Sequence, residues 1–349
     1  MIDKIDIASM TKAELCDYFK SIGEPKFRAE QVFSWISRGT PVSEMTNLSK
    51  ALREKLEKCA LNTLPTVEEK LVSKLDGTVK YLFKLYDGAC IESVLMRYNH
   101  GNTLCISSQV GCRMGCKFCA STIGGKVRDL LPSELLGQII AAEKDSGERI
   151  SNIVMMGIGE PLDNYDNVIK FLKLVNAEGG LNIGYRHISL STCGVVSGIL
   201  KLAEEDFPLT LSISLHAAND EKRSEIMPVN NKWKIAELLS ACVSYYKRSG
   251  RRISFEYTLI AGKNDGISDA DELGALLKKA FFGTGAPIHV NLIRVNEVKE
   301  TGFKKGSEES VKIFADRLSK YGIVATVRRR LGADVNAACG QLRRSNMAK

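Results

Sequence analysis

The chain has 349 residues, 44% of them hydrophobic, and its 49 basic and 41 acidic side chains give a net charge of +8. This length allows one large α/β domain with a smaller appendage. The first residues lack a signal-peptide core, and no apolar run approaches the ~18 residues of a membrane span. We therefore expect a cytoplasmic protein without a membrane segment, whose ten cysteines stay reduced. The excess of basic over acidic side chains favours a polyanionic partner but does not establish one.

Residues 1–62 have the pattern of a small helical domain. Thr11 and Glu14 match a capping box at the start of the first helix. Apolar positions at helical spacing predict two further helices, at about 28–37 and 49–59.

Residues 63–97 have the composition of strands. The Asp76-Gly77 pair between two β-rich runs is a strong hairpin signal, and another strand is expected at 90–96. We interpret this stretch as a short β extension between the helical domain and the remainder of the chain, 98–349.

The remainder alternates short apolar runs with amphipathic helical patterns. Strands are expected at 103–108, 152–157, 187–191, 209–215, 252–260 and 287–293. Helices are expected near 132–145, 164–177, 195–205, 232–248, 268–281 and 307–320. Six such units predict an α/β fold, an open partial (βα)6 TIM-like barrel that is two units short of a closed one. One more strand is expected at 323–327.

Three cysteines form a C-x3-C-x2-C array: Cys112, Cys116 and Cys119. Thiolates bind soft metals, so this loop predicts a metal site. A structural zinc site takes four ligands, and so does an ordinary iron–sulfur cube. A cube held by three cysteines would leave one iron open. The alternative is a zinc site with a fourth ligand such as Cys105.

Small or polar residues follow several of the expected strands, at the edge where α/β barrels place their functional groups. Each alone is more often a helix cap, a loop residue or a core residue, but together they predict a ligand pocket. The residues are Gly159, Glu160, Ser191, Ser214, His216 and Asn296, and the apolar Leu215 lies between two of them in the chain.

The cysteine loop, with Phe118 before its third cysteine, resembles that of the radical S-adenosylmethionine (SAM) enzymes. Five other segments are similar to the adenine-C2 RNA methyltransferases, the RlmN family: 23–32, 109–112, 155–162, 214–216 and 337–342. That family methylates an adenine in the peptidyl-transferase centre of 23S rRNA and adenine 37 of certain tRNAs. The likeness covers nearly the whole chain.

The resemblance implies a radical SAM core at 98–349 that ends in a catalytic cysteine segment. It implies a [4Fe-4S] cluster on Cys112, Cys116 and Cys119, with SAM bound by the strand-end residues named above. It also implies two SAM molecules per turnover and an S-methylcysteine intermediate on Cys339.

Two further residues gain roles from the resemblance. Cys105 would attack the Cys339 sulfur and release the methylated RNA, leaving a disulfide that a thiol reductant opens. Glu92 would accept the proton from C2. Without the resemblance, both cysteines would be interpreted as small buried hydrophobes and Glu92 as a structural surface residue.

The resemblance implies 23S rRNA and tRNA as partners and an electron donor such as flavodoxin or ferredoxin; we expect a monomer. Lys26 and Arg28 in the helical domain are candidate phosphate contacts, unless this domain is only a packing appendage. The basic C-terminal residues would either contact RNA or form a solvated tail. They are Arg328, Arg329, Arg330, Arg343, Arg344 and Lys349.

Two other functions stay open. Methylation at C8 of the same rRNA adenine uses similar cysteines, but Pro161 in the Gly159–Leu162 segment favours the C2 group. A non-enzymatic RNA-binding protein with a structural zinc is the second alternative. The chain also has Arg294 where the family usually has proline, which affects the expected shape of that loop.

Overall fold

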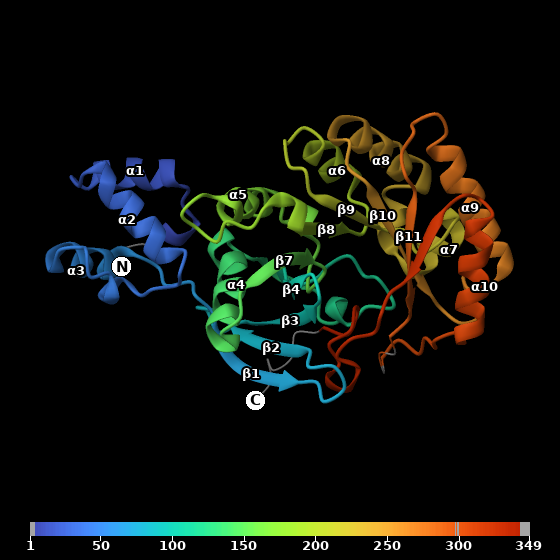
Figure 1. Ribbon diagram of the computed structural model, residues 1–349, viewed down its shortest axis with the longest axis horizontal. Coiled ribbons are helices and arrows are strands. Elements are labelled where there is room, and N and C mark those ends of the chain that lie inside the picture. The colour runs from blue at the N-terminus through green and yellow to red at the C-terminus, as the bar shows by residue number, and fades with distance from the viewer. Residues whose placement is uncertain (1–3, 297, 299, 343–349) are drawn as a thin grey trace.

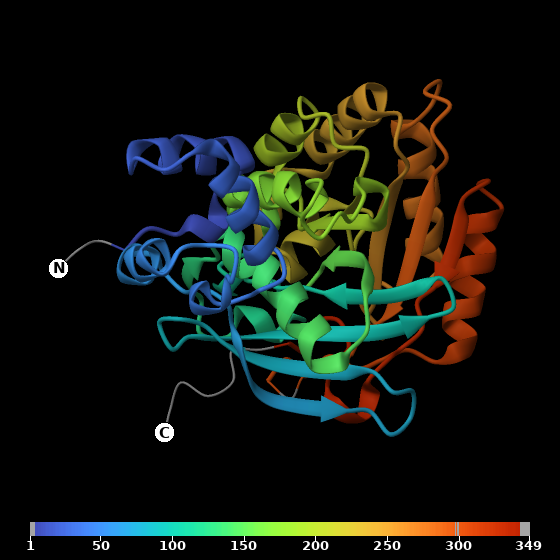
Figure 2. The same cartoon turned by 60° about the vertical axis from the view of Figure 1, so that its left-hand side comes forward.

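The computed structural model describes residues 4–296, 298 and 300–342. A small helical domain lies at one end of the molecule, beside a larger body built on a single curved sheet (Figures 1 and 2). In the described part of the chain, no helix is long and apolar enough to cross a membrane.

The helical domain contains α1 (Lys12–Ser21), α2 (Lys26–Ile36) and α3 (Lys50–Cys59). The expected capping box is confirmed, because Thr11 Oγ1 accepts from the Glu14 amide at 3.3 Å and the Glu14 carboxylate accepts from the Thr11 amide at 2.7 Å. The apolar faces of the three helices form a separate small core, which Leu174 of the larger body also joins.

The β extension consists of β1 (Thr66–Val72), β2 (Val79–Lys84) and β3 (Cys90–Tyr98), all antiparallel. The predicted hairpin is confirmed, with Val72 opposite Val79 across the turn. Strand β3 also pairs with the first strand of the body, β4 (Gly101–Cys105). The extension therefore continues the sheet of the body.

The body supplies seven parallel strands, in the order β4-β7-β8-β9-β10-β11-β12. After β4 they are β7 (Ile150–Met155), β8 (Ile188–Thr192), β9 (Thr210–Ser214), β10 (Ile253–Leu259), β11 (His289–Arg294) and β12 (Val324–Val327). The six expected units and the additional strand are confirmed, and the sheet stays open between β1 and β12.

The connecting helices are α4 (Pro132–Ser146), α5 (Tyr165–Asn176), α6 (Val196–Leu202), α8 (Ile235–Ser249), α9 (Ile267–Ala280) and α10 (Glu308–Ser319). Within the body, two features were not predicted. One is the short helix α7 (Asp220–Ile226), and the other is the pairing of β5 (Gln109–Gly111) with β6 (Lys126–Asp129) on either side of the cysteine loop.

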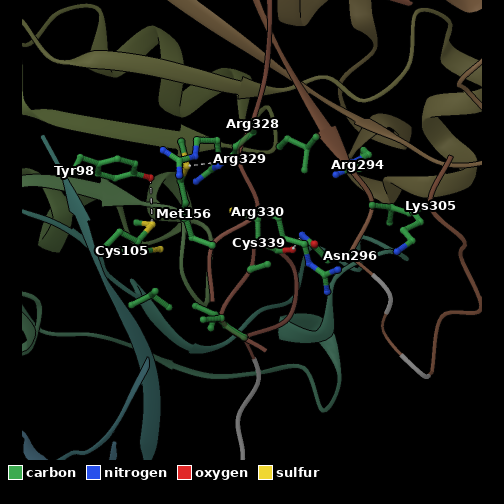
Figure 3. A pocket seen from close by; sticks show the side chains of 18 residues that line it. Tyr98, Cys105, Met156, Arg294, Asn296, Lys305, Arg328, Arg329, Arg330 and Cys339 are labelled. Atoms are coloured by element: carbon green, nitrogen blue, oxygen red, sulfur yellow. Dashed lines mark hydrogen bonds between the residues drawn. The ribbon is translucent and has the colours of Figure 1, made fainter. Parts of the chain in front are cut away.

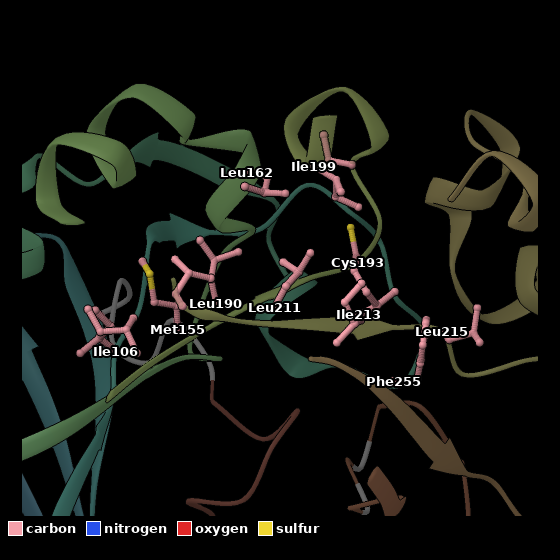
Figure 4. Close-up of a cluster of buried hydrophobic side chains, with 14 of the residues drawn as sticks. Ile106, Met155, Leu162, Leu190, Cys193, Ile199, Leu211, Ile213, Leu215 and Phe255 are labelled. Carbon is pink, nitrogen blue, oxygen red and sulfur yellow. The ribbon is translucent and has the colours of Figure 1, made fainter. Parts of the chain in front are cut away.

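Side chains alternate along the parallel strands between an apolar outer face and a polar inner face. Leu211 and Ile213 pack toward the helices in the main core (Figure 4). On the inner face, Ser189 Oγ lies 3.2 Å from Ser212 Oγ, and Asn291 Nδ2 donates to Glu256 at 2.8 Å. The concave side of the sheet is therefore lined with hydrogen-bonding groups.

Candidate active site

Two adjoining cavities lie at the carboxyl ends of the parallel strands. The first, here the loop cavity, has a volume of about 920 Å³ and is lined by the three loop cysteines and the strand-end residues. The second, here the basic cavity, has a volume of about 800 Å³ and is lined by Cys105, Cys339 and several arginines (Figure 3).

The three loop cysteines face the loop cavity together. Burial raises the pKa of Cys112 to about 12, raises that of Cys116 well above its ordinary value, and raises that of Cys119. As free thiols they hold their protons, which a metal must displace to bind.

The chemistry of this donor set fits an iron–sulfur cluster. Three cysteines on one loop supply soft thiolates, and in a cluster each would bind a different iron. Among the described residues, no three His, Cys, Asp or Glu side chains are grouped around a position for a single metal ion.

Glu160 is buried at the wall of the loop cavity. Its carboxylate accepts from the amides of Leu162 at 3.0 Å and Cys193 at 2.7 Å, and burial raises its pKa. Beside it, Gly159 has φ +106°, and a Cβ there would lie 2.7 Å from the Gln109 amide nitrogen. Glycine thus lets the backbone carrying Glu160 approach β5 closely.

His216 has φ +58°, a conformation that is rare for a residue other than glycine and is often found at functional sites. Its Nδ1 accepts from the Thr258 amide at 2.9 Å, and burial lowers its pKa to about 3, so the ring is neutral. The ring packs edge-on against Phe118 of the cysteine loop, with 4.9 Å between centroids. Leu215, expected beside it, lies instead in the main core (Figure 4).

Ser191, Ser214 and Asn296 line the loop cavity as expected. Asn296 Nδ2 also donates to the Cys339 carbonyl at 2.9 Å, which connects the end of β11 to the C-terminal segment. Asn296 and Cys339 line both cavities.

Cys339 is partly exposed, whereas the preceding Ala337 and Ala338 are buried. The small side chains beside Cys339 therefore leave its thiol sterically open. Cys105, at the end of β4, lines the basic cavity with it, and burial raises the pKa of Cys105 to about 12. Both are free thiols in this structure.

Glu92 is buried on β3 and forms an ion pair with Lys80 at 2.9 Å. It is not among the residues that line the two cavities. It shares a face of its strand with Val94 and Met96, since residues two apart point the same way, and both of these line the basic cavity.

The sequence left Arg328 either as an RNA contact or as part of a solvated tail, whereas in the structure its side chain lines both cavities. It is 3.9 Å from the carboxylate of Glu256, and the neighbouring Cys339 and Glu256 raise its pKa. Glu256 was not predicted as a site residue, although a carboxylate within a buried strand is a usable signal. Cys193, which was also not predicted as a site residue, lines the loop cavity as well.

The other basic residues have different surroundings. Arg329 and Arg330 are exposed at the basic cavity, together with Lys305. Arg28 donates to the Asn47 carbonyl at 2.8 Å within the helical domain. Arg343, Arg344 and Lys349 lie outside the described residues.

Comparison with known proteins identifies the family. Residues 106–273 match the family profile described as "Radical SAM superfamily", and residues 5–61 match "Ribosomal RNA large subunit methyltransferase N-terminal domain". The chain is 55% identical over 341 residues to a protein of Clostridium botulinum (strain Eklund 17B / Type B) named "Probable dual-specificity RNA methyltransferase RlmN", with 97% of this chain and 96% of that protein covered. The chain belongs to the RlmN family.

An RlmN relative from Alkaliphilus oremlandii, with the same printed name, is 54% identical over 347 residues, which is 99% of each chain. The crystal structure of a radical SAM methyltransferase from Sphaerobacter thermophilus is 40% identical, with a TM-score of 0.91 over 97% of this chain and 99% of that one. The resemblance noted in the sequence and the expected fold are thereby confirmed. Membership of the radical SAM superfamily implies a [4Fe-4S] cluster and SAM as cofactors.

Proposed function

We propose that this RlmN-family protein is a radical SAM enzyme that methylates C2 of an adenine in 23S rRNA and in tRNA. The observation that carries the proposal is the position of Cys339, which lies on the wall shared by the loop cavity and the basic cavity. A group carried on this sulfur can therefore face the SAM pocket on one side and RNA on the other.

The loop cavity is proposed to hold both cofactors. Cys112, Cys116 and Cys119 would bind the cluster. When bound, the cluster supplies an electron that cleaves SAM into methionine and a 5′-deoxyadenosyl radical, which can abstract a hydrogen atom. An electron donor such as flavodoxin or ferredoxin would reduce the cluster.

The remaining groups of the loop cavity suit the polar parts of SAM. The buried Glu160 carboxylate is an acceptor for its ammonium group, with Gly159 keeping the backbone close. The hydroxyls of Ser191 and Ser214 and the amide of Asn296 can bind the ribose and carboxylate, all three lining the cavity. His216 is neutral, and because its Nδ1 accepts from the Thr258 amide, its Nε2 carries the proton and can act as a donor. The Leu215 side chain lies in the main core, so this residue would contribute to the SAM pocket only through its backbone, between Ser214 and His216.

Cys339 is proposed to accept a methyl group from a first SAM molecule. Its thiolate forms the new S–CH3 bond while the sulfonium C–S bond breaks, and S-adenosylhomocysteine leaves. With a second SAM molecule, loss of a hydrogen atom from this methyl group allows its carbon to bond to adenine C2. The unpaired electron left on the adduct would return to the cluster when the C2 proton leaves.

Cys105 is proposed to release the product. Its thiolate attacks the Cys339 sulfur, an S–S bond forms, and the S–CH2 bond breaks with its electron pair going to carbon, which takes up a proton. Glu92 is proposed to accept the C2 proton, which its place on the same face of β3 as Val94 and Met96 supports. A cellular thiol would then reduce the disulfide.

The basic cavity suits folded RNA. Arg329, Arg330 and Lys305 present positive charge for phosphates, and the ring of Tyr98 offers a surface for an unstacked base. The helical domain, residues 1–62, would hold more of the RNA through groups such as the exposed Lys26. We propose that the protein works as a monomer in the cytoplasm, where thiol reductants are present.

Mass spectrometry of nucleosides tests the proposal. Anaerobically reconstituted protein is incubated with SAM, a reductant, and either tRNA or a 23S rRNA fragment, and 2-methyladenosine is expected. The Cys339→Ala variant should form none, whereas Cys242→Ala, which removes a buried thiol of α8, should retain activity. Formation of 8-methyladenosine alone, or of no methylated adenosine, would contradict the proposal.

A further inference from the structure

The turn between β1 and β2 contacts the segment that leads to Cys339. Ser73 Oγ donates to Asp334 Oδ1 at 2.6 Å, and the Lys74 amide donates to Asp334 Oδ2 at 2.9 Å. In the opposite direction, the Gly332 amide donates to Asp76 Oδ2 at 2.9 Å. We call these five residues the hairpin clasp. The C-terminal segment thus supplies the Asp334 carboxylate as an acceptor for the turn, and the turn supplies the Asp76 carboxylate as an acceptor for the segment.

The turn holds its own shape. The Ser73 amide donates to the Thr78 carbonyl at 2.8 Å, and the Gly77 amide donates to the Ser73 carbonyl at 3.1 Å. The second oxygen of Asp76 accepts from the Thr78 amide at 3.0 Å. The hairpin therefore presents preorganised groups to the C-terminal segment, which lowers the entropy cost of the contact.

The C-terminal segment is shaped to fit this turn. Gly332 has φ +59°, and a Cβ there would lie 2.6 Å from Ala337 Cβ and 3.0 Å from Thr78 Cγ2, so glycine permits the close approach. The Ala337 amide donates to the Gly332 carbonyl at 3.0 Å and closes the segment into a compact turn. Lys80 Nζ donates to the Asn336 carbonyl at 3.5 Å.

A second attachment lies just beyond Cys339. The Ala120 amide donates to the Gly340 carbonyl at 2.7 Å, and Ser121 Oγ donates to the Leu342 carbonyl at 2.7 Å. Both donors directly follow the cysteine loop. Cys339 is thus held between the hairpin clasp on one side and the cysteine loop on the other.

We propose that the hairpin clasp positions Cys339 for its two reactions, with Asp334 and Asp76 as positioning residues that touch neither cofactor nor substrate. This inference rests on the proposed function, in which one sulfur must meet SAM in the loop cavity and then RNA and Cys105 in the basic cavity. A displacement of about 1 Å can cost roughly 100-fold in rate, so the thiol needs attachments on both sides.

The Asp334→Ala variant tests the proposal, because Asp334 is exposed and, among the described residues, its side chain bonds only within the clasp. We expect kcat for RNA methylation to fall about 10- to 100-fold with KM for RNA unchanged. Methylation of Cys339, followed by mass spectrometry of the intact protein, should fall in parallel. Amide hydrogen exchange should rise in 331–342. Asp334→Asn keeps one acceptor and should give intermediate rates.

Asp316→Ala removes an exposed aspartate of α10 and serves as the matched control, with wild-type rates expected. Wild-type rates of Cys339 methylation in Asp334→Ala would overturn the proposal. So would a loss of rate accompanied by a lowered Tm and lost cluster content, with no rescue by Asp334→Asn, since that pattern indicates a structural role. Failure of the proposed function is a different result, in which the wild-type protein itself never gains a methyl group on Cys339.

Discussion

Replacing Arg223 with methionine should destabilise the protein and weaken SAM binding together. The guanidinium of Arg223 is fully buried and donates to the carbonyls of Leu215 at 3.0 Å, Cys193 at 2.7 Å and Ser214 at 3.2 Å, and to Asn230 Oδ1 at 2.9 Å. It therefore ties together the ends of β8 and β9. Methionine leaves these acceptors buried without donors, at about 1–3 kcal/mol each before relaxation. Because the surrounding structure relaxes in part, we expect the free energy of unfolding to fall by about 3–6 kcal/mol. The free energy of unfolding of a typical protein is about 5–15 kcal/mol.

Urea unfolding followed by circular dichroism measures the stability, and isothermal titration measures SAM affinity. Arg223→Lys, which keeps the charge with fewer donors, should lie between wild type and methionine. Arg248→Met is the control. Within the described part of the chain this exposed arginine of α8 pairs with Glu204 alone, at 3.4 Å, and the pair should contribute less than about 1 kcal/mol to the free energy of unfolding. The reasoning is refuted if Arg223→Met unfolds within about 1 kcal/mol of wild type and binds SAM equally well.

Three further predictions concern the thiols and the buried histidine. Cys105→Ala should trap an RNA–protein crosslink on denaturing gels and Cys339→Ala should not, whereas a free methylated product from Cys105→Ala would contradict the assigned roles. Cys116→Ala should lose the brown colour of the reconstituted cluster, and Cys193→Ala, in the same cavity, should keep it; equal loss would make Cys193 a ligand. Burial lowers the pKa of His216 to about 3, so the native state binds fewer protons than the unfolded chain and stability falls as pH drops below about 6.5. When the pH is lowered from 7 to 5, the free energy of unfolding measured with urea should fall by about 2 kcal/mol more in the wild type than in His216→Asn. An equal fall in both proteins would refute a buried neutral ring.

Local sequence patterns predicted most of the fold, because strand alternation, helix capping and tight turns depend on residues that are close together in the chain. Strand runs with polar residues at every second position became β8 to β10, with serines and Glu256 on the inner face. The capping box at Thr11 and the Asp76-Gly77 turn formed as expected. Helix α7 was missed because its seven residues contain a single apolar one, Ile226, and therefore show no apolar period. The pairing of β3 with β4 was missed because a strand's own residues do not specify its neighbour.

The sequence by itself determined the cysteine loop, since three thiols within eight residues stay together in any fold, and it determined which polar groups end the strands. Only the tertiary structure decided that Cys339 lies beside that loop, that Arg328 turns inward between two cavities, and that a hairpin from the start of the sheet holds the segment before Cys339. The physical reason is that these contacts join residues far apart in the chain. Their formation depends on the packing free energy of the whole sheet, which no local pattern contains.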